Sequence, residues 1–165
     1  LLPEDRKIFT MIRNPLKRFL SGYIEVKKLY GMGNKEHTFR KLPPNVEDDI
    51  FRKSKLPESF ELYISEIERN GFFDSHNLPQ YTFLEGYTVP DLFLIPRKIK
   101  NVTNFLRFEE MNDQISTLVG DEVVIEKFNV GNVTVKEALS PLLEKYKDRI
   151  ELLYPEDFKL YNQIN

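Results

Sequence analysis

An arginine, a helix start and a serine lie close together near the N-terminus of the sequence. Arg13 follows the apolar run 8–12, Asn14-Pro15 comes next, and Ser21 lies a little further along. A guanidinium group can bind two phosphate oxygens at once, and a serine hydroxyl can add a neutral hydrogen bond. Free N–H groups at a helix start also attract anions. The pattern is consistent with a phosphate site, and on physics alone a capped helix with solvated basic residues explains it equally well.

A short strand and an amphipathic helix would position these residues. Residues 7–12 form a short apolar run between charges, which predicts a buried parallel strand. Asn is a favoured N-cap and Pro a favoured first helical residue, so we expect a helix from residue 15 to about residue 30, ended by Gly31. Its apolar residues recur every three or four positions and leave Ser21 on the polar face. Ligands of α/β proteins bind where such strands end.

The rest of the sequence predicts more helix than strand. We expect a polar loop over residues 34–56, a helix from Pro57 to near Gly71, short strands at 91–95 and 104–108, and a helix over 110–118. A further helix over 135–146 would have Thr134 as its N-cap, and residues 150–161 continue in helical period. Few strands among many helices indicate an α/β domain, and the length of 165 residues fits a single domain.

The composition excludes several classes of function. The absence of cysteine excludes disulfide scaffolds, thiolate metal sites and cysteine nucleophiles. No apolar run approaches the roughly 20 residues of a membrane-spanning helix. A net charge of −2 disfavours general nucleic-acid binding. Residues 1–41 nevertheless carry ten Lys and Arg against four Asp and Glu, so an anionic ligand is expected at this end of the chain.

Four segments resemble one enzyme family. Residues 13–23, Arg-Asn-Pro-Leu-Lys-Arg-Phe-Leu-Ser-Gly-Tyr, resemble the 3′-phosphate-binding motif of sulfotransferases that use 3′-phosphoadenosine-5′-phosphosulfate (PAPS), usually Arg-Asp-Pro-x-x-Arg-x-x-Ser-x-Tyr. Asn14 replaces the commoner Asp and keeps the helix cap. Three further segments are similar to parts of the carbohydrate sulfotransferase branch. Residues 74–80 resemble its Asp-x-His-x-x-Pro-Gln segment, residues 105–111 its "RFENL" step and residues 153–161 its closing helix.

The resemblance implies a P-loop-like α/β sulfotransferase fold in which Arg13 and Ser21 bind the 3′-phosphate of PAPS. The implied reaction transfers a sulfuryl group from PAPS to a hydroxyl of a carbohydrate acceptor, leaves PAP and needs no metal. As in phosphoryl transfer, the protein would mainly align the reactants and stabilise charge. We further hypothesise that His76 lines the acceptor cleft with Gln80 one helical turn away. A loop hydrogen bond is the alternative role for His76, and no residue is assigned as the catalytic base.

One half of the family's cofactor site is not found in this sequence. The loop with Lys or Arg that cradles the 5′-phosphosulfate lies upstream of the Arg13 motif in the family, so we expect residues 1–165 to be the C-terminal part of a longer sulfotransferase domain. The alternative function is a non-catalytic helical interaction module or a degenerate sulfotransferase relative. Eukaryotic members are membrane-anchored in the Golgi lumen and bacterial ones are cytoplasmic; the lack of cysteine favours the latter compartment.

Overall fold

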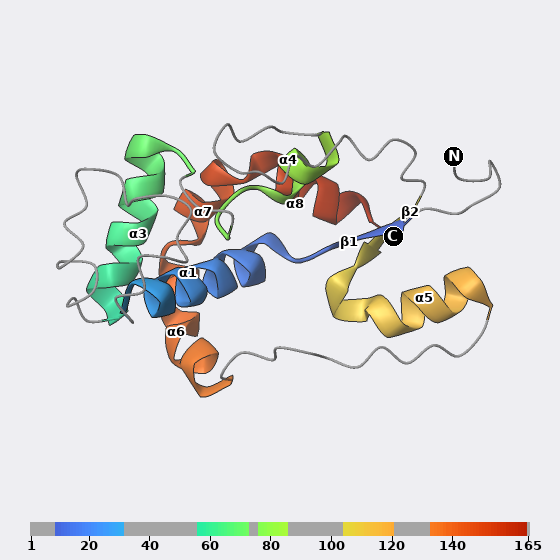
Figure 1. Ribbon diagram of the computed structural model, residues 1–165, viewed down its shortest axis with the longest axis horizontal. Helices are drawn as coiled ribbons and strands as arrows, with labels where there is room; N and C mark the ends of the chain where they lie inside the picture. Colours follow the sequence, from blue (N-terminus) through green and yellow to red (C-terminus); the bar gives the residue numbers. More distant parts are fainter. Residues whose placement is uncertain (1–8, 32–55, 73–75, 86–103, 121–132, 165) are drawn as a thin grey trace.

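The computed structural model describes residues 9–31, 56–72, 76–85, 104–120 and 133–164 (Figure 1). In chain order these form β1 (Phe9–Ile12), α1 (Pro15–Gly31), α3 (Leu56–Asn70), α4 (Gln80–Glu85), β2 (Asn104–Arg107), a 3₁₀ turn (Phe108–Glu110), α5 (Met111–Val119), α6 (Val133–Lys145), α7 (Lys147–Leu153) and α8 (Pro155–Gln163). Helices predominate over two strands, which is compatible with the expected α/β class, while the P-loop-like fold stays a prediction. The expected loop 34–56 lies almost entirely outside the described residues, and the expected strand 91–95 lies wholly outside them.

The two strands pair in parallel, from Phe9 opposite Asn104 to Ile12 opposite Arg107. The strands predicted at residues 7–12 and 104–108 are therefore confirmed. The expectation that the first strand is buried is wrong for half of its described residues, because Phe9 and Met11 are each 40 % exposed. The physical reason is that the described sheet has only two strands. The composition of β1 is that of a strand covered on both faces, yet one face of it is exposed.

The predicted N-terminal helix is confirmed, and so is its cap. Oδ1 of Asn14 accepts a hydrogen bond from the main-chain N–H of Lys17 at 3.2 Å, three residues along, as an N-cap does. Phe19 and Tyr23 are buried on one face of α1 at 2 % and 0 % exposure, as their spacing predicts. The cap fixes the start of α1 directly after β1, which places Arg13 at the junction of strand and helix.

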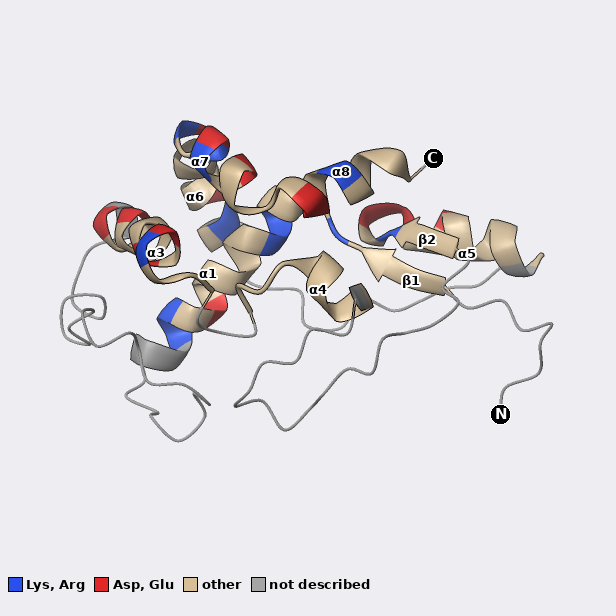
Figure 2. Cartoon of the chain, turned by 90° about the horizontal axis from the view of Figure 1, so that it is seen from above, with Lys and Arg blue, Asp and Glu red and all other residues tan. Residues whose placement is uncertain are grey.

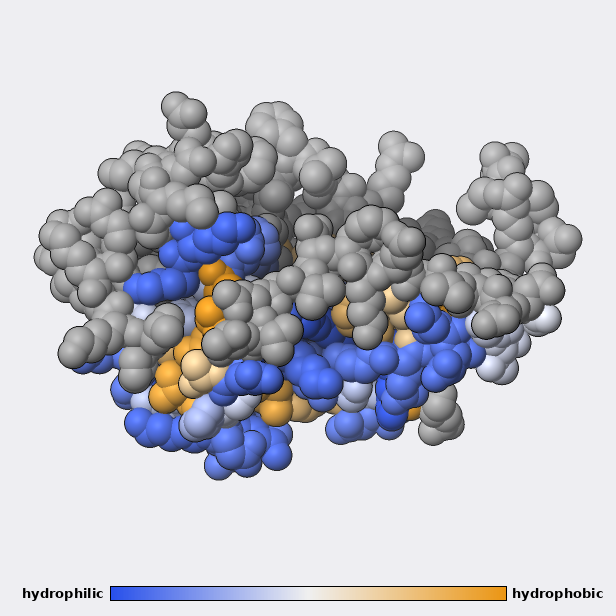
Figure 3. Space-filling view, turned by 90° about the horizontal axis from the view of Figure 1, so that it is seen from below, coloured by the Kyte–Doolittle hydropathy of each residue, from blue (hydrophilic) through white to orange (hydrophobic). Residues whose placement is uncertain are grey.

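The apolar core lies among α1, α3, α6 and α7, on the left of Figure 1. Large aromatic residues dominate it, and rings from α1 and α3 meet edge to face, with the centroids of Phe19 and Phe60 5.7 Å apart. Viewed from below, hydrophilic side chains form most of the described surface, interrupted by small apolar patches (Figure 3). None of the described helices is both long enough and apolar enough to cross a membrane.

The C-terminal helices follow the predicted pattern with two differences. The helix α6 begins at Val133, so Thr134 lies inside it and is not its N-cap, contrary to the expectation. The predicted helical stretch 150–161 is divided at Tyr154, after which Pro155 begins α8. Proline has no N–H to donate and is tolerated at a first helical position, so the chain can turn there and begin a new helix.

Candidate functional site

Two consecutive peptide groups at the end of β1 are held by distant parts of the chain. The main-chain N–H of Arg13 donates to Oε1 of Gln80 at 2.8 Å, and Nε2 of Gln80 donates to the carbonyl oxygen of Arg13, also at 2.8 Å. The next N–H, that of Asn14, donates to both carboxylate oxygens of Glu109 at 3.1 and 3.3 Å. The backbone that presents the Arg13 side chain is therefore fixed by residues that follow α3 and β2.

The guanidinium group of Arg13 is half-buried and lies 5.4 Å from the centre of the Phe108 ring. Its Nε is buried and makes no hydrogen bond with any of the described residues. Burial lowers the pKa of Arg13, the negative charge of Glu109 acts in the opposite direction, and Arg18 lowers it further. Because arginine ordinarily titrates above pH 12, the group stays charged at neutral pH. A charged group with a buried donor that has no partner among the described residues suits an anionic ligand.

The segment 76–81 packs along α1 next to this arginine. A Cβ atom at Gly22 would overlap the main-chain carbonyl oxygen of His76, so glycine is what allows this close approach. One turn nearer the start of α1, Nη2 of Arg18 donates to the carbonyl oxygen of Leu78 at 2.8 Å. These two contacts attach the segment to α1, and the Gln80 amide attaches it to Arg13 just before the helix.

Residues of the C-terminal helices also hold segment 76–81. The hydroxyl of Tyr154 donates to the carbonyl oxygen of Asn77 at 2.7 Å. The carboxylate of Asp157, which is fully buried, accepts hydrogen bonds from the main-chain N–H groups of Gln80 and Tyr81 at 2.7 and 2.9 Å. These are the first two N–H groups of α4, which have no partner within the helix, so Asp157 satisfies them from a distant helix.

Two opposite charges flank this segment, the half-buried Arg18 and the fully buried Asp157. Burial lowers the pKa of Arg18, whereas the charge of Asp157 raises it. Burial likewise raises the pKa of Asp157, against the effect of its two main-chain hydrogen bonds and of Arg18. Figure 2 shows basic positions along α1 beside acidic positions at the start of α8. Each group makes the burial of the other less unfavourable, so removing one would leave an uncompensated charge inside the protein.

The contacts above join four segments that are far apart in the sequence. They meet at the start of α1 and comprise residues 13–23, 76–80, 105–111 and 153–161. The model of the sulfotransferase family matches residues 4–162. The chain belongs to the sulfotransferase family. This confirms the family that the sequence motifs predicted and supports a sulfotransferase activity. Neither the comparison with curated proteins nor that with solved structures finds a match.

The four residues that the sequence analysis assigned to the sulfotransferase site occupy different environments. Arg13 and Gln80 are in direct contact, and Gln80 is only 8 % exposed. Ser21 is half-buried on α1, adjacent to Gly22, and His76 is exposed beside the same helix. The structure thus brings Arg13 and Gln80 together, and the carbonyl of His76 against Gly22. The roles of all four in ligand binding stay predictions.

Residues that hold the site together were missed by the sequence reasoning. The sequence motifs assign no role to four residues that lie inside the family-like segments: Arg18, Phe108, Glu109 and Asp157. Their contacts join residues 60 to 95 positions apart, for example Arg18 with Leu78 and Asn14 with Glu109. The signal that could have found them is their place inside the four segments that resemble the family.

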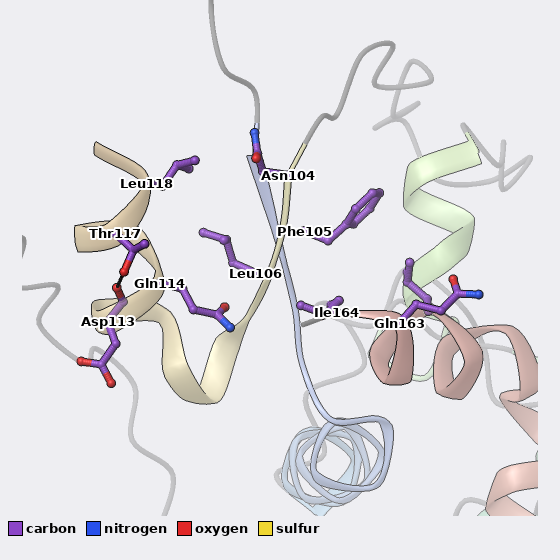
Figure 4. A pocket seen from close by; sticks show the side chains of 10 residues that line it. Asn104, Phe105, Leu106, Asp113, Gln114, Thr117, Leu118, Gln163 and Ile164 are labelled. Carbon is purple, nitrogen blue, oxygen red and sulfur yellow. Dashed lines mark hydrogen bonds between the residues drawn. The ribbon is translucent and has the colours of Figure 1, made fainter. Parts of the chain in front are cut away.

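A separate hollow of about 730 Å³ lies along β2 between α5 and α8 (Figure 4). None of the four predicted site residues lines it. Its polar groups are partly satisfied internally, because Gln114 accepts from the N–H of Arg107 at 2.6 Å and the hydroxyl of Thr117 donates to the carbonyl of Asp113 at 2.9 Å. The Nε atoms of Arg13, Arg18 and Arg107 are all buried without a partner among the described residues, but Arg18 and Arg107 donate through Nη2 to the carbonyls of Leu78 and Ile164. We place the candidate functional site at Arg13, whose guanidinium makes no such hydrogen bond within the described part of the chain.

Proposed function

We propose that this sulfotransferase takes the sulfuryl group from PAPS and transfers it to a hydroxyl of a carbohydrate acceptor. The observation that carries the proposal is the guanidinium of Arg13, whose buried Nε has no partner among the described residues and whose backbone is fixed on both sides. A fixed positive charge at a strand end, directly before a helix start, suits a phosphate group. A 3′-phosphate is the feature that distinguishes PAPS from a nucleotide such as ATP.

Within this proposal the residues of the site have distinct roles. Arg13 binds and partly neutralises the 3′-phosphate, and the hydroxyl of Ser21, two turns into α1, donates a further hydrogen bond to it. PAPS, when bound, supplies the activated sulfuryl group. We assign its 5′-phosphosulfate to a loop that precedes Arg13 in a longer sulfotransferase domain. Holding the nucleotide at both ends would align it with the acceptor, which is the main task of the protein in this kind of transfer.

We also propose that His76 contributes to the acceptor side. It is exposed, and its backbone lies against Gly22, the residue that follows Ser21. An imidazole can exchange a proton near neutral pH and can hydrogen-bond a sugar hydroxyl. We expect a His76→Ala variant to raise the KM for the acceptor or lower turnover, with His37→Ala, the other histidine of the chain, as the control. Wild-type kinetics in His76→Ala would remove His76 from the site.

The test of the nucleotide site is a calorimetric titration of the full-length protein with PAP and with 5′-AMP. Wild type should bind PAP more tightly than AMP. In Arg13→Ala this preference should fall about ten- to a hundredfold, because a charge-assisted phosphate contact contributes about 1.5–3 kcal/mol. Lys28→Ala is the matched control, since it removes an exposed cation from the far end of the same helix.

Two results would contradict the proposal. One is wild-type protein that binds PAP and AMP equally well, and the other is an Arg13→Ala variant that keeps the full preference for PAP. Either result would favour the alternative of a non-catalytic interaction module or a degenerate member that has lost the nucleotide site.

A further inference from the structure

The side chain of Gln80 takes the place of a neighbouring strand at the end of β1. The β1–β2 pairing ends at Ile12, and the next residue, Arg13, has both of its main-chain polar groups bound to the amide of Gln80. A primary amide presents one acceptor and one donor at the same edge, as a strand does to its neighbour. The amide therefore extends the hydrogen bonding of β1 by one residue without any additional strand.

The amide of Gln80 is itself held in one place. The main-chain N–H of Gln80 donates to the buried carboxylate of Asp157 at 2.7 Å, and the residue is only 8 % exposed. Two residues earlier the carbonyl of Leu78 accepts from Arg18 at 2.8 Å. Hydrogen bonds to charged groups are shorter and stronger than neutral ones. The side chain consequently has little freedom to leave the Arg13 backbone.

This arrangement limits where the Arg13 side chain can point. Its backbone is fixed by Gln80, the following N–H by Glu109, and its guanidinium lies over the Phe108 ring. An arginine loses considerable side-chain entropy when it is ordered by a ligand. A group that is already ordered before binding loses less, so the same phosphate contact yields a higher affinity.

We propose that Gln80 is a positioning residue for Arg13, which fixes the Arg13 backbone through its side-chain amide and so aims the guanidinium at the 3′-phosphate. This inference rests on the proposed function. It differs from a role in binding the acceptor, because the Oε1 atom and one N–H of Gln80 are already bound to the Arg13 backbone.

The first test replaces Gln80 by a side chain of similar size without an amide. In the full-length protein, Gln80→Met should reduce the preference for PAP over AMP by about tenfold, because both hydrogen bonds to Arg13 are lost. The affinity for AMP, which lacks the 3′-phosphate, should change much less. Gln163→Met is the matched control, since Gln163 is an exposed glutamine on α8, and it should leave both affinities unchanged.

A second variant separates positioning from a general loss of structure. In Gln80→Glu at neutral pH, the carboxylate can accept from the Arg13 N–H but cannot donate to the Arg13 carbonyl. Protonation restores a donor in the same place, so the preference for PAP should recover as the pH falls, whereas Gln80→Met should show no recovery. The new carboxyl would lie near the carboxylate of Asp157, which binds the main-chain N–H of residue 80, and near Glu109, which binds the N–H that follows Arg13. The 3′-phosphate also titrates, so each variant is compared with wild type at the same pH.

The outcomes separate this inference from the proposed function. Wild type without a preference for PAP overturns both. A wild-type preference that persists in Gln80→Met, or a Gln80→Glu variant whose preference does not recover at low pH, overturns the positioning role and leaves the nucleotide site standing. If Gln80→Met does not fold, the pH dependence of Gln80→Glu alone decides.

Discussion

The aromatic core and the site around Arg13 both use the helix α1, but different forces hold them. In the core, Phe60 is fully buried and its ring meets that of Tyr23 edge to face at a centroid distance of 4.9 Å. At the start of the helix, the Arg13 backbone exchanges directional hydrogen bonds with the Gln80 amide, and the N–H of Asn14 donates to Glu109. Apolar burial is not directional and chiefly determines stability, whereas hydrogen bonds fix the direction in which a group points.

The largest effect that tests this comparison between core and site is expected in the core. We expect Phe60→Ala to lower the free energy of unfolding by about 3–5 kcal/mol, because it removes a large buried ring and leaves a cavity. The preference for PAP over AMP in the folded protein should stay near that of wild type. Denaturant unfolding and calorimetry measure the two quantities. Leu152→Ala, at a position that is 81 % exposed, is the control for a change of apolar side chain.

A loss of PAP preference in Phe60→Ala comparable with that in Arg13→Ala would show that the core and the site are not separable in this way.

Substitutions of two glycines test the same comparison with a smaller expected change in the free energy of unfolding. In Gly22→Ala the new Cβ overlaps the carbonyl oxygen of His76, a main-chain atom that cannot easily move aside. We expect a destabilisation of about 1–2 kcal/mol from overpacking together with a several-fold loss of PAP preference, because the 76–81 segment is displaced from α1. Gly71→Ala should cost about 1 kcal/mol through its positive φ of 77° while leaving PAP preference unchanged.

Unfolding midpoints and PAP and AMP titrations of both glycine variants provide the measurements. Equal effects of the two variants on PAP preference would contradict the idea that contact between segment 76–81 and α1 positions Arg13.

The smallest effect is expected at an exposed ion pair. Nη2 of Arg149 on α7 lies 2.6 Å from a carboxylate oxygen of Glu68 on α3, and this hydrogen bond holds the pKa of Glu68 below its ordinary value of 4.5. A lowered native pKa adds stability that is present above pH 4.5 and is lost as the pH falls through the native pKa. Solvent screening keeps the contribution below about 1 kcal/mol.

Glu68→Gln should therefore be slightly less stable than wild type at pH 7 and equal to it near pH 2, with an unchanged preference for PAP. Thermal unfolding at both pH values checks this expectation. A large loss of stability at pH 7 would mean that this surface ion pair contributes to the free energy of unfolding as strongly as the aromatic packing of the core does.

Much of the local structure could be predicted because its causes are local. Asn14-Pro15 specifies the start of α1, and the spacing of Phe19 and Tyr23 specifies which face of the helix is buried. The family could also be predicted, because its motifs are short and keep their order along the chain. The open face of β1 and the start of α6 at Val133 could not, because sheet coverage and the choice of a first helical residue depend on what packs nearby.

The sequence by itself determined the elements around Arg13, the family, and the arginine and serine expected to bind phosphate. Only the tertiary structure decided that Gln80 binds the Arg13 backbone and that Asp157 holds Gln80. These contacts join residues 67 and 77 positions apart, and no periodicity or cap signal extends over such distances. In the sequence, a glutamine whose amide replaces a strand cannot be told from one that is free to bind a sugar. The two roles differ only in the folded chain, where Gln80 lies at the end of β1.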